Sequence, residues 1–296
     1  MRQAQAPQTP GRVRDALAGS GLAPLHRLGQ HFLADRHLCE RIAAAVVTLG
    51  PEACLEIGPG LGALTVALLE AGRSVVAVEL DRGLAAYLRE HAARPGDALR
   101  VVEGDARDVA LEALCDPAAT AFVGNLPYYA SAPLIRRALA APYPGAVLML
   151  QREVAERLAA PPGSAARGAL TVLREATCDV RSLFAVPPSA FYPRPDVASA
   201  VVRLERRPDA LGGARYEALD RLAGQAFRYR RKGMRQALRH GGTVGGAAVE
   251  RVLAGAGIDP SRRPETLALD EWLALLRACE DEGGETRCLP AAPAGS

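Results

Sequence analysis

Five short apolar runs, separated by segments with helical periodicity, dominate the first half of the chain. They cover residues 53–57, 74–78, 99–103, 121–124 and 146–150. Each run is too short for a helix and shows little polar alternation, which is the pattern of strands buried on both faces of a parallel sheet. Helical segments between the runs, such as 61–69 and 84–91, supply the crossovers that parallel pairing needs. The sequence therefore predicts an α/β fold with a doubly wound, mostly parallel sheet.

The pattern changes in the second half of the chain. Two more strand-like runs, at 178–186 and 198–204, are joined by a proline-rich segment and fit antiparallel additions at one sheet edge. Residues 206–214 have the Pro, Gly and Asp content of a linker. Beyond the linker, only amphipathic helical stretches follow, at 216–227, 233–238, 247–254 and 267–279. We expect these helices to form a small C-terminal all-α domain.

These patterns divide the chain into four expected parts. Residues 1–24, rich in Ala, Gln, Pro and Gly, are expected to form a disordered N-terminal arm. Residues 25–205 form the α/β domain, 206–280 the helical domain, and 281–296 a flexible tail that is acidic and then rich in Ala and Pro. The arm lacks the apolar run of a secretory signal, while its arginines leave an organelle transit peptide as an alternative.

Cysteine usage and hydropathy indicate the compartment. The six cysteines form no CxxC pair and no metal-like cluster with the five histidines, so we expect free thiols in a reducing compartment and no metal site. No stretch approaches the roughly 18 apolar residues of a membrane-spanning helix. The sequence therefore predicts a cytoplasmic protein without a membrane partner.

A glycine-rich loop follows the first predicted strand. The segment Glu56-Ile57-Gly58-Pro59-Gly60-Leu61-Gly62 leads into a helical stretch. Glycines at such a turn let the backbone approach a ligand, and the helix N-terminus offers free amide groups. Glu79 follows the second strand, 19 residues after Gly60, where a carboxylate binds ribose hydroxyls. Gly58, Gly60 and Glu79 therefore predict a site for an adenosine-bearing cofactor.

Dinucleotides and S-adenosylmethionine both use this loop geometry, so the loop leaves the cofactor open. Two features at later strand ends favour S-adenosylmethionine. Asp105 follows the third strand, where its carboxylate can accept a hydrogen bond from the amino group of an adenine. The fourth strand ends in a polar and aromatic tetrad, Asn125-Leu126-Pro127-Tyr128.

This tetrad fits one reaction. The exocyclic amine of adenine is a poor nucleophile because its lone pair is delocalised into the ring. Two acceptors, the Asn125 side-chain carbonyl and the main-chain carbonyl of Leu126 or Pro127, can hold both amine protons and favour a pyramidal nitrogen. Pro127 removes a competing amide donor, and Tyr128 offers a face for the base. The tetrad indicates methylation of an adenine amine, a reaction that needs alignment more than proton transfer, so we expect no essential histidine.

Positive charge is concentrated in one segment of a chain whose net charge is only +3. Residues 206–263 carry 13 basic and 5 acidic side chains. Six of the basic residues, interleaved with aromatic residues and without an acid among them, form what we call the basic segment: Arg228, Arg230, Arg231, Lys232, Arg235 and Arg239. Such charge density repels itself unless an anion is near, so the basic segment predicts a phosphate-binding face for RNA.

Taken together, the motifs resemble those of the ribosomal RNA adenine dimethyltransferases, and most closely those of the small-subunit type. They run in the family's order from Leu28 to Leu276: LGQHFL at 28–33, EIGPGLG at 56–62, VELD at 78–81, GDA at 104–106, GNLPYYAS at 124–131, QREVAERL at 151–158 and VPPSAFYPRPDVASAVVRL at 186–204. The resemblance implies a Rossmann-like S-adenosylmethionine-dependent methyltransferase fold with a seven-stranded sheet. It also implies dimethylation of two adjacent adenines near the 3′ end of 16S rRNA, in the 30S subunit or its precursor, by a monomeric enzyme.

The resemblance also assigns residues. It implies cofactor contacts at Gln30, His31, Leu33, Gly58, Glu79, Asp105 and Asn125, the last of which also serves the target amine. Tyr128 and Phe191 would stack on either side of the flipped adenine; a core position for Phe191 is the alternative.

The chain departs from the family pattern at three positions. His31, Tyr129 and Gln236 stand where the family usually or often has asparagine. An imidazole can still donate and accept, whereas Tyr129 alters either the binding of the target or local packing. Two other functions also stay open: a 23S rRNA adenine methyltransferase of the macrolide-resistance type, and an RNA-binding assembly or transcription factor on the same fold.

Overall fold

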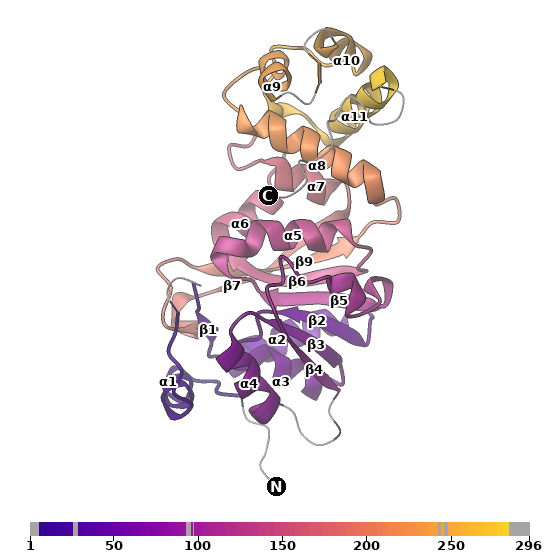
Figure 1. Cartoon of the computed structure of the whole chain (residues 1–296). Coiled ribbons are helices and arrows are strands. Elements are labelled where there is room, and N and C mark those ends of the chain that lie inside the picture. The colour runs from indigo at the N-terminus through magenta and orange to yellow at the C-terminus, as the bar shows by residue number, and fades with distance from the viewer. Residues whose placement is uncertain are drawn as a thin grey trace. The chain divides into compact units, whose positions relative to one another are not determined.

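The computed structural model of the chain describes residues 6–25, 29–92, 96, 98–241, 244–245 and 248–283. The chain divides into two compact units. Figure 1 colours the chain by residue number. We call Met1–Ala155 with Cys178–Arg206 the sheet unit, and Glu156–Thr177 with Arg207–Ser296 the helical unit.

The sheet unit contains a seven-stranded sheet with the order β4-β3-β2-β5-β6-β9-β7. Its strands are β2 (Ala53–Ile57), β3 (Ser74–Glu79), β4 (Leu99–Glu103), β5 (Thr120–Asn125), β6 (Gly145–Gln151), β7 (Cys178–Val186) and β9 (Ser199–Arg206). Strands β2 to β6 pair in parallel, and β9 runs antiparallel between β6 and β7. The predicted fold class is confirmed, including the two antiparallel pairings at one edge.

Helices cover both faces of this sheet. They are α2 (Arg36–Val47), α3 (Ala63–Glu70), α4 (Arg82–His91), α5 (Ser131–Ala140) and α6 (Arg152–Leu158), the last of which crosses the boundary between the units. Alternate strand residues such as Cys54 and Val123 pack with α2, α3 and α4 on one face. Phe122 points to the opposite face, where its ring meets that of Tyr143 at 5.3 Å between centroids, just beyond α5. Short 3-10 turns lie at Leu111–Ala113, Pro117–Ala119, Tyr128–Ala130, Pro188–Ala190 and Pro264–Thr266.

The N-terminal arm is not disordered over the residues that the structure describes. Residues 10–19 form helix α1 (Pro10–Gly19), which the Thr9 side chain caps by accepting the Arg12 amide. Val13 and Leu17, one turn apart, are buried in a cluster with Phe32, Leu61, Leu84 and Tyr87. The expectation was wrong because a cap residue, a proline at the first helical position and two spaced apolar residues outweigh a loop-like composition. Residues 1–5 lie outside the described part of the chain.

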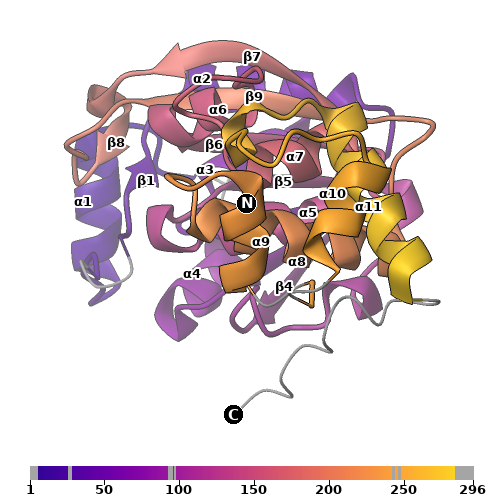
Figure 2. The same cartoon turned by 90° about the horizontal axis from the view of Figure 1, so that it is seen from above.

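A second, two-stranded sheet joins distant parts of the sheet unit. Strand β1 (Phe32–Leu33) pairs antiparallel with β8 (Phe191–Tyr192), and the Ala34 amide donates to the Ala190 carbonyl at 2.7 Å. Figure 2 shows α1 beside β1 and β8. This pairing fixes the segment before α2 against the loop that leads into β9.

The helical unit is built from α7 (Ala169–Glu175), α8 (Gly213–Arg228), α9 (Met234–Gly241), α10 (Val249–Gly255) and α11 (Leu269–Gly283). Its core surrounds the fully buried Trp272, which stacks on Phe227 with 5.8 Å between ring centroids. Residues 284–296, most of the expected tail, lie outside the described residues, while 281–283 belong to α11.

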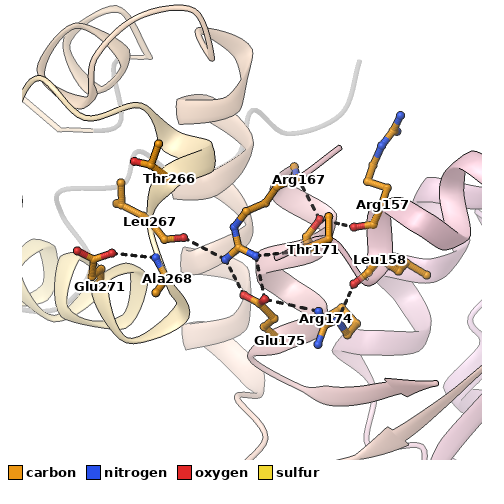
Figure 3. Close-up of polar contacts among 12 residues, drawn as sticks. Arg157, Leu158, Arg167, Thr171, Arg174, Glu175, Thr266, Leu267, Ala268 and Glu271 are labelled. Atoms are coloured by element: carbon orange, nitrogen blue, oxygen red, sulfur yellow. Dashed lines mark hydrogen bonds and ion pairs between the residues drawn. The ribbon is translucent and has the colours of Figure 1, made fainter. Parts of the chain in front are cut away.

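The domain boundary differs from the expected one. Residues 156–177 were assigned to the α/β domain but belong to the helical unit. Figure 3 shows why: the buried Arg167 makes two hydrogen bonds to Glu175, at 2.8 and 2.6 Å, and a third to the Leu267 carbonyl at 3.1 Å. A partner 100 residues away in the sequence leaves no local signal, so pattern reading could not place this segment.

The described cysteines are free thiols, and burial raises the pKa of Cys39 and Cys54 to about 12. Cys288 lies outside the described residues. None of the helices described in the structure has the length and apolar character that crossing a bilayer requires.

Candidate active site

The structure brings nearly all of the predicted site residues of the sheet unit around one cavity, at the carboxyl ends of β2 to β5. The site residues that line it are Gln30, His31, Leu33, Gly58, Gly60, Glu79, Asp105, Asn125, Leu126, Pro127 and Tyr128. Because β2 pairs with β3 on one side and with β5 on the other, the strand order reverses here. Ligands of open α/β sheets bind at such a point.

The glycine-rich loop approaches the cavity in a conformation that needs glycine. Gly58 and Gly60 have φ values of 69° and 59°. A Cβ atom on Gly60 would lie 2.9 Å from the Phe32 ring, so neither the backbone angle nor the space admits a side chain. The Gly60 amide donates to the Glu79 carboxylate at 3.0 Å. The loop and the end of β3 are therefore held together at the position expected for a ribose.

Glu79 is buried and accepts two main-chain hydrogen bonds. Its second oxygen accepts from the Asp81 amide at 2.9 Å. Burial raises the pKa of Glu79, and the two amide donors oppose that shift by stabilising the carboxylate. Each oxygen still has a lone pair for a ligand hydroxyl, since a carboxylate offers about four acceptor positions.

The Asn125 amide is oriented by the segment that directly precedes α2. Its Nδ2 donates to the His31 main-chain carbonyl at 3.1 Å. This contact fixes which end of the amide is nitrogen and leaves Oδ1 as an acceptor without a donor among the described residues. Leu126 is anchored next to it by a hydrogen bond from its amide to the Met149 carbonyl at 3.2 Å. The side-chain amide of Asn125 is therefore held in one orientation.

Tyr128 forms an aromatic wall with His31. The ring centroids lie 5.7 Å apart, and the Tyr128 hydroxyl shares a hydrogen bond of 3.0 Å with Ser199. His31 Nδ1 lies 2.8 Å from the Pro193 carbonyl, which can only accept, so Nδ1 carries the proton. His31 thus packs and donates in the wall.

Phe191 does not line the cavity. It is 2% exposed and belongs to the core cluster beneath the sheet, with Leu33 and Ala190. The expectation that Phe191 and Tyr128 would stack on either side of a base is not met, because the β1–β8 pairing turns the Phe191 side chain into the apolar core. The core position was the alternative for this residue, and the sequence alone could not choose between the two.

Sequence reasoning missed two features of the cavity. Glu56, counted only as part of the loop motif, is 1% exposed and accepts a 2.6 Å hydrogen bond from Thr65. At the rim, the exposed Tyr129 lies beside Arg107, which is paired with Asp105. A carboxyl in an otherwise apolar strand was the available signal for Glu56; nothing in the sequence indicated the Arg107 pair.

The basic segment lies in the helical unit, at the end of α8, in the following turn and on α9. Its charge is partly compensated, because Glu250 of α10 pairs with Arg235 at 2.8 Å and with Arg239 at 3.2 Å. Arg230 donates to the Ala165 carbonyl at 2.8 Å. Arg228, Arg231 and Lys232 are exposed and have no ion pair within the described part of the chain. The sequence expectation of wholly unpaired charge was therefore too strong.

The sheet order and the cavity define a Rossmann-like, S-adenosylmethionine-dependent methyltransferase with a helical C-terminal region. Residues 25–276 match the family of ribosomal RNA adenine dimethylases. The chain belongs to that family.

Relatives and solved structures agree with this assignment. The ribosomal RNA small subunit methyltransferase A of Rhodospirillum rubrum is 42% identical over 285 residues, which cover 94% of this chain and 97% of that protein. The protein of the same name from Pelotomaculum thermopropionicum is 38% identical, over 94% and 98% of the two chains. The crystal structure of a dimethyladenosine transferase from Plasmodium falciparum has a TM-score of 0.71 at 26% identity, covering 86% of this chain and 98% of that one.

Proposed function

We propose that this chain transfers methyl groups from S-adenosylmethionine to the N6 amines of two adjacent adenines near the 3′ end of small-subunit rRNA, during ribosome biogenesis. The observation that carries the proposal is the Asn125 amide, whose Oδ1 is left to accept while Nδ2 donates to the His31 carbonyl. Membership of the family and the names of relatives at about 40% identity support the substrate class.

The cofactor half of the cavity consists of the loop at Gly58 and Gly60, the Glu79 carboxylate for the ribose and Asp105 for the adenine amine. The segment before α2 closes this half of the cavity with Gln30, His31 and Leu33. Gln30 is itself held, because its Oε1 accepts from the Leu25 amide at 2.8 Å. When bound, S-adenosylmethionine supplies an electrophilic methyl group on a sulfonium sulfur.

The substrate half holds the amine by two acceptors. Asn125 Oδ1 accepts a hydrogen bond from one N–H of the amine. The Leu126 carbonyl is the better candidate to accept from the other N–H, because the Pro127 carbonyl already accepts from the Ala130 amide at 3.0 Å. Holding both protons draws the nitrogen toward a pyramidal shape and localises its lone pair. Tyr128 supplies the face on which the base stacks. Alignment of the nitrogen with the methyl group then lowers the barrier. No side chain needs to transfer a proton in the step that forms the bond between nitrogen and methyl carbon.

The RNA is engaged by the exposed cations of the basic segment, Arg228, Arg231 and Lys232, with Arg230, Arg235 and Arg239 in supporting contacts. Single-stranded adenines cost little to flip out of a loop. We propose a monomeric enzyme acting in the cytoplasm, on the 30S subunit or its precursor.

The alternative of a 23S rRNA methyltransferase is less well supported. The crystal structure of the 23S rRNA methyltransferase ErmE is similar, with a TM-score of 0.58 at 28% identity, but the small-subunit relatives described above are 38% and 42% identical. An RNA-binding factor without catalysis has no need for an oriented Asn125 amide.

The test is methyl transfer from labelled S-adenosylmethionine to 30S particles that lack the modification, followed by mass spectrometry of the 3′ fragment of the rRNA. We expect two adjacent dimethyladenines with the wild-type chain. Asn125→Ala should lose about 100-fold or more in rate, as for the removal of one donor from an oxyanion hole. Incorporation into 23S rRNA alone, or equal rates for wild type and Asn125→Ala, would overturn the proposal.

A further inference from the structure

The loop after β4 presents Asp105 to the cavity already paired. Arg107 donates to both oxygens of the Asp105 carboxylate: Nη2 at 2.6 Å, Nε at 3.0 and 3.1 Å, and the main-chain amide at 2.8 Å. This contact lowers the pKa of Asp105. The group expected to accept the adenine amine of the cofactor is therefore occupied by a residue of the same loop.

The backbone of this loop is held independently of the Arg107 side chain. Arg137 of α5 donates through Nη1 to the carbonyls of Ala106, Arg107 and Val109, at 2.7, 3.1 and 2.7 Å. Three carbonyls anchored to one guanidinium keep the Asp105 backbone in place. The Arg107 side chain, which is 43% exposed, can therefore leave Asp105 without unfolding the loop.

Tyr129 lies beside this side chain while it is paired with Asp105. Its ring lines the same cavity, is 47% exposed, and lies with its centroid 5.5 Å from the guanidinium carbon of Arg107. A guanidinium at that distance from an aromatic face is weakly attracted to it.

We propose that Arg107 competes with the adenine amino group of the cofactor for the Asp105 carboxylate, and that Tyr129, beside the paired guanidinium, favours the paired state. The inference rests on the proposed role of Asp105 as the acceptor for that amine. Two donors that need the same oxygens weaken each other reciprocally. Arg107 thus reduces cofactor affinity, and it does so only for a base that carries an amino group.

The experiment measures dissociation constants by calorimetry for S-adenosylhomocysteine and for its inosine counterpart, which has an oxygen in place of the amine. S-adenosylhomocysteine replaces S-adenosylmethionine because its sulfur carries no positive charge. Removing a positive charge from the protein then does not by itself strengthen binding of the ligand. The proteins are the wild type, Arg107→Ala, Tyr129→Leu and the double variant. Arg82→Ala, an exposed arginine at the start of α4, is the matched control for loss of charge.

Arg107→Ala should bind S-adenosylhomocysteine about two- to fivefold more tightly than the wild type, which is the range of an exposed ion pair, and should gain nothing for the inosine counterpart. Tyr129→Leu should strengthen S-adenosylhomocysteine binding slightly, and only while Arg107 is present, so that the double variant matches Arg107→Ala. Arg82→Ala should match the wild type.

Unchanged or weaker binding of S-adenosylhomocysteine by Arg107→Ala would overturn the competition, as would an equal gain for both ligands. A wild-type chain that binds neither ligand would instead contradict the proposed function. The two failures are therefore distinguishable.

Discussion

Glu56 places a carboxyl group in the apolar floor of the active-site cavity, where it is almost fully buried. Burial raises its pKa to about 7, although the hydrogen bond from Thr65 opposes the shift. The folded protein therefore holds a proton on Glu56 at pH values where the unfolded chain, with a pKa of about 4.5, has lost it. The free energy of unfolding should fall as pH rises from about 4.5 to about 7, and should then level off.

Glu56→Gln should remove this part of the pH dependence. A shift of this size corresponds to about 3 kcal/mol, so the variant should gain roughly that much over the wild type at pH 8 and little at pH 4.5. Urea unfolding followed by circular dichroism at both pH values measures the difference. Glu52→Gln, at an exposed carboxyl near the start of β2, is the control. Parallel pH profiles for the wild type and Glu56→Gln would refute the buried-carboxyl account.

Single residues also show how far the sequence could be read. The Asn125 acceptor could be predicted because its chemistry follows from residue type and strand position alone. Phe191 could not, because its side-chain direction depends on β1, a strand of two residues that leaves no periodic signal. The Arg107–Asp105 pair was equally hidden, since it depends on side-chain conformations in a loop.

At the scale of elements, the buried strands were the most predictable part of the chain. Strands β2 and β4 have the predicted bounds, although β4 lies at the sheet edge and none of its residues is buried. Helix α1 was missed because only two of its residues are buried. Those two, Val13 and Leu17, pack on Phe32, Leu61 and Leu84, which also line the active-site cavity. The arm therefore packs against side chains that line the site.

Leu17→Ala should loosen this packing. Truncation of a buried leucine costs about 2–5 kcal/mol, and part of this loss should appear as weaker S-adenosylhomocysteine binding. Thermal unfolding and calorimetry on the same samples separate the two effects. Asp15→Ala, on the exposed side of α1, should change neither. A Leu17→Ala chain with full cofactor affinity would show that α1 is not coupled to the site.

The basic segment should behave unevenly toward RNA. Arg231→Ala, which removes an exposed cation without an ion pair among the described residues, should make the log–log salt dependence of rRNA binding shallower by about 1. Arg235→Ala should change it less, because Glu250 already neutralises that side chain. Filter binding at several salt concentrations gives the slopes, with Arg277→Ala on α11 as the control. Equal slopes for Arg231→Ala and Arg235→Ala would remove the distinction drawn from the Glu250 pair.

At the scale of the whole molecule, the chain passes three times between its two units, at 155–156, 177–178 and 206–207. The helical unit is therefore assembled from two separate stretches, which Arg167 and Glu175 join to Leu267 (Figure 3). A sequence reader sees one boundary near residue 206, because only there does composition change. The insertion of residues 156–177 follows from tertiary contacts alone.

Glu175→Ala should leave a buried guanidinium without its partner and destabilise the helical unit by about 3–5 kcal/mol. Trp272, the single tryptophan of the chain, lies in that unit, so its fluorescence reports the loss during urea unfolding. Binding of S-adenosylhomocysteine, which uses the sheet unit, should persist at low urea. Glu280→Gln, in the exposed pair with Arg215, should cost under about 1 kcal/mol. Equal costs for the two variants would show that the buried network does not stabilise this unit.

The position of β9 between β6 and β7 has a consequence for synthesis. A nascent chain that has emerged as far as Val186 contains β6 and β7, yet the strand that must separate them has not been made. The open edge of β6 is then free to pair with whatever strand is nearest, which is how growing chains are trapped. Correct folding of this catalyst of ribosome maturation must therefore wait until translation has passed Arg206.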